Sequence, residues 1–151
     1  MYLCKKRNAM KYPHTATVDM HFNAPVSAVW DGLTNPDQIR KYFFGTEAVS
    51  DWKKGSTLHF KGVWEGTGYL DKGFILDIEK DALLRYSYFS SFSGQEDIPE
   101  NYGEITYRLS AENGGTKLTI FQQNIETEEK AKHSVDNWKM VMGGLKDLLE
   151  K

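Results

Sequence analysis

The sequence predicts an α+β domain in which a curved antiparallel sheet of about six to seven strands wraps around one long C-terminal helix. Three observations lead to this prediction. Alternating apolar and polar residues, broken by short turns, fill the middle of the chain. Two short helical segments follow the first strand. The end of the chain carries the one long amphipathic stretch that could cover the apolar face of such a sheet. The length of 151 residues fits a single domain.

The first strand is predicted to begin at Thr15, because apolar side chains such as Val18 and Phe22 then recur at every second position. The segment that ends at Pro25 breaks this alternation, and proline is tolerated in the first turn of a helix. Apolar residues at helical spacing then predict two short helices, one on each side of a break at residues 34–36.

The middle of the chain is predicted to consist of strands joined by tight turns. Glycine-containing segments at 51–55, 65–68 and 113–115 supply the turns, since glycine adopts positive φ without strain. On the longest strand, Phe74 and Ile78 are expected to share the inner face. The strands are predicted at residues 57–64, 69–79, 84–88, 105–109 and 118–122.

The C-terminal helix is predicted over residues 128–150. Gly143 and Gly144 interrupt it, at a cost of about 0.5–1 kcal/mol each relative to alanine. They either leave space for a ligand or let another element approach closely, and we favour the close approach. The helix carries one apolar stripe, formed by Ala131, Val135, Trp138, Met142, Leu145 and Leu149.

Residues 1–14 are predicted to form a flexible basic leader before a single domain at residues 15–151. The apolar stretch of a secretory signal does not follow this leader. The sequence also contains no run of about 18 apolar residues that would predict a membrane-spanning helix. These features favour a cytoplasmic protein, with Met1 and Met10 both candidates for the native start.

Composition and motifs argue against several functional classes. Nineteen basic against 21 acidic residues give a net charge of −2, which does not favour nucleic-acid binding. The one cysteine, Cys4, cannot form an internal disulfide or a cysteine-rich zinc site. The four histidines lack metal-ligand spacing, so we predict neither a metal site nor a cofactor. No pattern predicts a catalytic set.

Aromatic residues make up 13% of the chain, and many share the inward parity of the sheet. These rings either pack a solid core or line a ligand cavity, and the sequence leaves both interpretations open. Inward tyrosine hydroxyls need polar partners, which slightly favours a cavity. Gln122 could add another inward polar group, or it could lie at a strand end and point to solvent. The candidate ligand-binding residues are Trp30, Phe43, Phe60, Phe74, Tyr86, Tyr88, Tyr107, Gln122, Trp138 and Met142.

The polar segment from Ser90 to Tyr102 is long for a connection between antiparallel strands. It carries Phe92 and Ile98 among polar residues. Long connections of this kind are often functional, and our hypothesis is that this segment forms a lid over one mouth of the cavity.

Short motifs in the first half of the chain resemble those of a known family. Residues 23–30 resemble the segment APxxxVW, and the residues from Thr34 to Phe43 resemble its continuation LTxP…WF. Residues 50–55 resemble a DxRxGG hairpin in which Ser56 replaces the second glycine.

The second half of the chain continues this pattern. Residues 69–84 resemble YxxxGxVxExxPPxxL, although a Lys-Asp pair replaces the prolines. Residues 114–119 resemble GGTxLT, and the helix from Trp138 resembles GWxxxLxxLK, with Asn137 in place of a glycine. In this order and spacing, the motifs resemble the START-like, SRPBCC-type helix-grip superfamily, in its heat-shock-protein ATPase activator-like (AHSA-type) branch.

The resemblance covers residues 15–151 and implies a helix-grip fold with a hydrophobic cavity between the sheet and the C-terminal helix. It implies no shared catalytic set, so no activity follows from it. The leading hypothesis is a domain that holds a hydrophobic or aromatic small molecule, such as a lipid, as a monomer or a homodimer. One alternative is an enzyme, cyclase- or hydrolase-like, whose cavity tyrosines act as acid or base, which requires a lowered tyrosine pKa. The other is a module that binds a chaperone.

Overall fold

The computed structural model describes residues 10–150. Most of the predicted leader, at residues 1–9, therefore lies outside the described residues. The elements are β1 (His14–Phe22), α2 (Val26–Thr34), α3 (Pro36–Tyr42), β2 (Glu47–Ser50), β3 (Thr57–Trp64), β4 (Thr67–Glu79), β5 (Leu83–Tyr88), η1 (Pro99–Asn101), β6 (Gly103–Glu112), β7 (Gly115–Ile125) and α4 (Glu128–Leu149).

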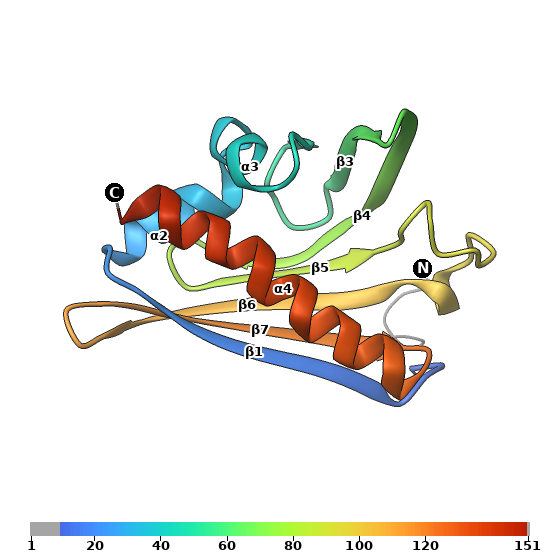
Figure 1. The fold of residues 1–151 in the computed structure, drawn as a ribbon. Coiled ribbons are helices and arrows are strands. Elements are labelled where there is room, and N and C mark those ends of the chain that lie inside the picture. The colour runs from blue at the N-terminus through green and yellow to red at the C-terminus, as the bar shows by residue number, and fades with distance from the viewer. Residues whose placement is uncertain (1–9, 151) are drawn as a thin grey trace.

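The strands form one seven-stranded antiparallel sheet in the order β1-β7-β6-β5-β4-β3-β2. The helix α4 runs across one face of this curved sheet, and α2 and α3 pack near the C-terminal end of α4 (Figure 1). We call the face of the sheet toward α4 the inner face and the opposite one the outer face. The arrangement confirms the predicted α+β helix-grip fold, with its curved sheet around a C-terminal helix.

Local sequence explains where the elements turn and begin. Asn113 and Gly114 form the two-residue loop between β6 and β7, and both adopt positive φ, as a tight hairpin turn requires. The Asn35 side chain accepts a hydrogen bond from the Asp37 amide and so caps α3. The Thr127 hydroxyl accepts one from the Lys130 amide and caps α4 in the same way.

A β-bulge in β4 overturns one prediction. Ile75 pairs with Tyr86 and Asp77 pairs with Arg85, so Leu76 is an extra residue without a partner on β5. The bulge reverses which side chains face inward, because side chains alternate along a strand. The inward orientation predicted for Phe74 is therefore wrong: Phe74 lies on the outer face with 48% of its surface exposed, whereas Ile75 is buried.

The core lies between the inner face of the sheet and the helices. Its most deeply buried side chains include Phe22 of β1, Leu118 of β7, and Met142 and Leu145 of α4. A side chain at Gly32 would approach Leu145, so this glycine allows α2 to pack closely on α4. The close packing of α2 on α4 means that core side chains fill the space between the helices and the sheet.

The close approach favoured for the glycines of α4 is found at one of them. A Cβ atom at Gly144 would lie 3.4 Å from the Cβ atom of Tyr42, in the last turn of α3. A Cβ atom at Gly143 would have no neighbour within 4 Å. Gly144 therefore marks the contact between α3 and α4, and Gly143 does not.

Within residues 10–150, no helix is long and apolar enough to cross a membrane. The same part of the chain contains no group of three or more His, Cys, Asp or Glu side chains placed to hold a metal ion. Cys4 lies outside it.

Candidate functional site

A continuous chain of aromatic rings crosses the inner face. Neighbouring rings in it have centroids 5.6–6.1 Å apart, mostly in tilted or edge-to-face arrangements, which aromatic pairs prefer. The chain starts at the exposed end of the β3–β4 hairpin and ends on α4. We call it the aromatic chain, and its members in order are Trp64, Phe44, Phe43, Phe60, Tyr86, Tyr107 and Trp138.

The polar atoms at the buried end of the aromatic chain have partners inside the protein. The hydroxyls of Tyr86 and Tyr107 form a hydrogen bond of 2.9 Å with each other. The indole nitrogen of Trp138 donates to Oε1 of Gln122 at 2.7 Å. Gln122 is thus half-buried and points inward, rather than toward solvent. These bonds satisfy polar groups that would otherwise be costly to bury.

A small cavity of about 10 Å³ adjoins the aromatic chain beneath α3. This volume has room for at most about one water molecule, so no organic ligand fits without rearrangement. The sequence left open whether the aromatic rings pack a solid core or line a ligand cavity. In this structure they pack a nearly solid core. The cavity is lined by Leu33, Ile39, Tyr42, Phe43, Trp52, Leu58, Phe60, Leu84, Tyr86 and Tyr107.

The predicted site residues divide by position. Phe43, Phe60, Tyr86 and Tyr107 line the cavity. Two more, Trp30 and Met142, are buried in the core without lining it, and Phe74 is on the outer face. Trp138 and Gln122 form the hydrogen-bonded pair beside Tyr107, and the Tyr88 ring contacts that of Phe60. The structure therefore places nine of the ten on the inner side of the fold, and seven of these are linked by shared cavity lining, ring contacts or a hydrogen bond. Their role in binding stays a prediction.

Burial controls the ionisation of the inner tyrosines. Desolvation raises the pKa of Tyr86 and Tyr107 well above 10, and the same cause raises the pKa of Tyr42. Tyr88 also has a raised pKa, first through burial and then through the neighbouring Asp71 carboxylate. All four hydroxyls are neutral near pH 7 and can serve as hydrogen-bond donors.

Asp71 is an inner-face carboxylate that sequence reasoning missed. It is only 8% exposed, and its Oδ2 accepts a hydrogen bond of 2.5 Å from the Tyr88 hydroxyl. Its Oδ1 accepts from the amide and hydroxyl of Ser91, at 2.8 and 3.2 Å. The bulge at Leu76 hid it, because unbroken alternation from Ile78 places Asp71 on the outer face. Trp52 was missed as well, since the turn at 51–55 gives no sign that its ring reaches the cavity.

The segment from Ser90 to Tyr102 is fastened to the sheet at both ends. Asp71 holds Ser91 at the start, and Asp97 forms an ion pair with Lys72 at 2.6 Å. The Tyr102 hydroxyl donates to Asp97, and the Tyr102 ring stacks on Phe89. Phe92 remains 56% exposed. These contacts, with the Phe92 ring 5.8 Å from that of Tyr69, describe a segment docked along β4, and its function as a lid stays a hypothesis.

Comparison with known structures supports the fold. A Cytophaga hutchinsonii protein studied in solution is 45% identical, with 93% of this chain and 97% of that chain aligned and a TM-score of 0.81. CalU16 from Micromonospora echinospora is 25% identical over 87% of this chain and 73% of its own, with a TM-score of 0.69. The Aha1 dimer from Colwellia psychrerythraea is 19% identical over 91% and 96%, with a TM-score of 0.71, and shows likeness of fold alone.

No curated protein matches the sequence. The model of one family does, over residues 23–150, and its description is activator of Hsp90 ATPase homolog 1-like protein. That match covers most of the chain, from the end of β1 to the end of α4. It agrees with the branch that the motifs of the sequence resemble. The chain therefore belongs to the activator of Hsp90 ATPase homolog 1-like family.

Proposed function

We propose that the protein binds a neutral hydrophobic or aromatic small molecule beneath α3, in the space where the small cavity now lies. The observation that carries the proposal is the lining of that cavity, in which aromatic residues surround a gap and include Tyr86 and Tyr107, whose hydroxyls are hydrogen-bonded to each other. Apolar walls with a few placed polar groups are typical of small-molecule sites. Family membership supports a ligand-binding domain in general terms.

Binding requires that the cavity grow, and α3 is the element that can move. This helix has seven residues, of which Ile39 alone is buried. Phe43, directly after it, is half-buried between the cavity and the exposed Phe44. A ligand that displaced the Phe43 ring would take over its contact with Phe60 and keep the aromatic chain continuous. The cost of displacing the ring lowers the affinity for the ligand.

The experiment is a fluorescence titration with N-phenyl-1-naphthylamine, a neutral apolar probe. We expect saturable binding by the unaltered protein. In the variant Phe43→Ala the ring need not be displaced, so we expect binding tighter by on the order of tenfold, equivalent to about 1.4 kcal/mol. Native mass spectrometry of freshly purified protein tests the same proposal without a probe, through a co-purified small molecule.

Phe74→Ala is the matched control, because it removes the same ring from the outer face. We expect it to bind the probe as the unaltered protein does. Absence of saturable binding in both the unaltered protein and Phe43→Ala would contradict the proposal, and so would equal changes in Phe43→Ala and Phe74→Ala.

Catalysis by the inner tyrosines is less well supported. A tyrosine that acts as a base near neutral pH needs a lowered pKa, whereas burial raises the pKa of Tyr86 and Tyr107. The hydroxyls therefore fit the recognition of a carbonyl or hydroxyl on a bound molecule. Cytoplasmic location likewise stays a prediction.

A contact with a chaperone is the second candidate function, and the family match supports it. Phe44 and Trp64 offer a surface for such a contact, since both rings are about half exposed and lie 5.8 Å apart. The test is a pull-down of purified heat-shock protein 90 with its ATP hydrolysis measured alongside. We expect Trp64→Ala to weaken capture, whereas no capture by the unaltered protein would eliminate this candidate.

A further inference from the structure

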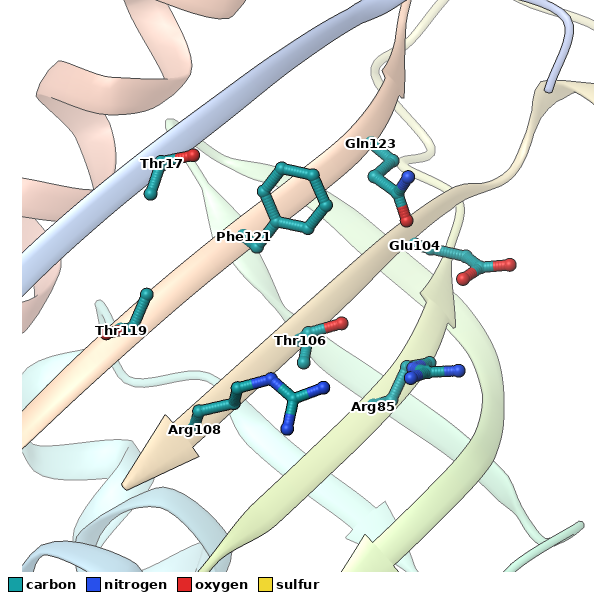
Figure 2. A pocket seen from close by; sticks show the side chains of 8 residues that line it. All are labelled: Thr17, Arg85, Glu104, Thr106, Arg108, Thr119, Phe121 and Gln123. Carbon is teal, nitrogen blue, oxygen red and sulfur yellow. The ribbon is translucent and has the colours of Figure 1, made fainter. Parts of the chain in front are cut away.

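A hollow lies on the outer face, opposite the aromatic chain. Its volume is about 420 Å³, within the range of small-molecule sites. Figure 2 shows its eight side chains projecting from β1, β5, β6 and β7. We call it the outer groove, and its lining consists of Thr17, Arg85, Glu104, Thr106, Arg108, Thr119, Phe121 and Gln123.

The sheet register explains why this face is hollowed. Thr106 of β6 pairs with Arg85 of β5 on one side and with Phe121 of β7 on the other. Arg108 and Glu104 lie two residues away from it along β6, on the same face. A short side chain is thus surrounded by four long ones, and the space above Thr106 stays open (Figure 2).

Three polar side chains at the outer groove, Arg85, Thr106 and Arg108, have unused bonding capacity. Among residues 10–150, neither Arg85 nor Arg108 has a hydrogen-bond or ion-pair partner, although both guanidinium groups border the same hollow. Thr106 is only 6% exposed, and its hydroxyl has no hydrogen-bond partner in that part of the chain either. Two guanidinium groups that border one hollow without a carboxylate partner are suited to bind an anion, and the Thr106 hydroxyl can donate to the same group.

We propose that the outer groove binds a small organic anion, in which a carboxylate or phosphate group is attached to a flat apolar ring. The guanidinium groups of Arg85 and Arg108 pair with the anionic oxygens, since their planar donors fit carboxylate and phosphate. The Thr106 hydroxyl donates a further hydrogen bond. The ring of Phe121 packs against the apolar part, and the groove has room for both parts of the ligand.

The charge distribution favours a small molecule over a nucleic acid. Two arginines and one glutamate line the outer groove, and the chain as a whole has a net charge of −2. A nucleic acid needs a longer basic path along its backbone. The outer groove is also separate from the site beneath α3, because on β5 and β6, the two strands that contribute to both, side chains of opposite parity line the two sites.

The test is an NMR titration of the isotope-labelled full chain, which follows the backbone amides, with phenyl phosphate and benzoate as probes. We expect saturable shift changes centred on β5, β6 and β7 around Arg85, Thr106 and Phe121. We expect Arg108→Gln to weaken binding at least tenfold and Thr106→Val to weaken it about threefold. The matched control is Arg40→Gln, which removes the same charge from α3 and should bind as the unaltered protein does.

Three outcomes would overturn the proposal. The first is the absence of saturable shifts at these strands with both probes. The second is equal weakening by Arg108→Gln and Arg40→Gln, which would indicate an effect of net charge. The third is equal affinity for inorganic phosphate, or tighter binding of a single-stranded oligonucleotide, since neither ligand needs a groove for one ring. N-phenyl-1-naphthylamine carries no anionic group, so the two proposed sites can fail independently.

Discussion

The inner and outer faces of the sheet differ in a way that their composition does not predict. On the inner face, Tyr86, Tyr107 and their neighbours leave a cavity of about 10 Å³. On the outer face, polar residues around Thr106 leave a groove of about 420 Å³. Aromatic side chains fill the space that they enclose, whereas a short residue among long ones leaves it open. Polarity of the lining is therefore a poor guide to where a sheet has room for a ligand.

The two faces also differ in how far their polar groups are hydrogen-bonded within the protein. The inner hydroxyls of Tyr86 and Tyr107 bond to each other, and Trp138 bonds to Gln122. The outer Thr106 hydroxyl has no partner among residues 10–150. The inner face is thus complete without a ligand and must open to accept one, whereas the outer groove is open and its two arginines have no partners among residues 10–150.

The largest expected difference between the faces is in stability. Trp138→Ala removes a buried ring from the inner side and should lower the free energy of unfolding by about 3–5 kcal/mol. Phe121→Ala removes a half-buried ring from the outer face and should lower it by roughly 1 kcal/mol. Urea unfolding measures both values. Equal losses would show that the two faces are packed alike.

The next comparison tests the bulge in β4 with two neighbouring residues. Ile75→Ala creates a cavity in the core and should lower the free energy of unfolding by about 2–4 kcal/mol. Phe74→Ala should change it by less than about 1 kcal/mol, because that ring is half exposed. Urea unfolding of the two variants shows which of the two side chains faces the core. A larger loss of stability for Phe74→Ala would support the orientation predicted from simple alternation.

A third comparison sharpens the role of the buried carboxylate. Asp71→Ala leaves the Tyr88 hydroxyl and the Ser91 amide without their acceptor and should lower the free energy of unfolding by about 2–3 kcal/mol. Hydrogen exchange at Ser91 should become faster. Ser91→Ala removes one hydroxyl and keeps the amide bond, so its loss should be about 0.5–1 kcal/mol. If exchange in the segment from Ser90 to Tyr102 did not change, Asp71 would not hold that segment in place.

The smallest effect concerns pH. Burial raises the pKa of Tyr86 and Tyr107, while an unfolded tyrosine titrates near pH 10. Above about pH 10 the folded state therefore retains protons that the unfolded state releases, so stability falls as pH rises there. Between pH 7 and about pH 10 these groups should contribute no change. Absorbance at 295 nm measures tyrosine ionisation, and titration of these hydroxyls in the folded protein below pH 10 would contradict their burial.

The sequence predicts the fold because the signals that determine it are local. Alternating parity marked the strands, the Asn113–Gly114 pair marked a tight turn, and the apolar stripe through Trp138 marked α4. The site was predictable only where alternation is unbroken, as at Tyr86 and Tyr107. The bulge at Leu76 adds one residue without a clear signature, so Phe74 was assigned to the wrong face and the inward Asp71 was missed.

The outer groove could not be predicted because it depends on which side chains are neighbours across four strands. Arg85, Thr106 and Phe121 are far apart in sequence, and their row exists only once the register is known. The size of the inner cavity was equally hidden, since Trp52 enters it from a turn. The sequence of one strand indicates which of its side chains share a face. The space between side chains of different strands depends on the packing of the whole fold.

The central claim is that the packed inner face opens beneath α3 to admit an apolar ligand. The most direct measurement is the set of intermolecular nuclear Overhauser effects between N-phenyl-1-naphthylamine and the methyl groups of the protein. The account predicts contacts to Leu33, Ile39 and Leu84, which line the present cavity, together with loss of the Phe43–Phe60 ring contact. Contacts to the methyl groups of Thr17 and Thr119 in the outer groove, or no contacts from a bound probe to the cavity lining, would contradict it.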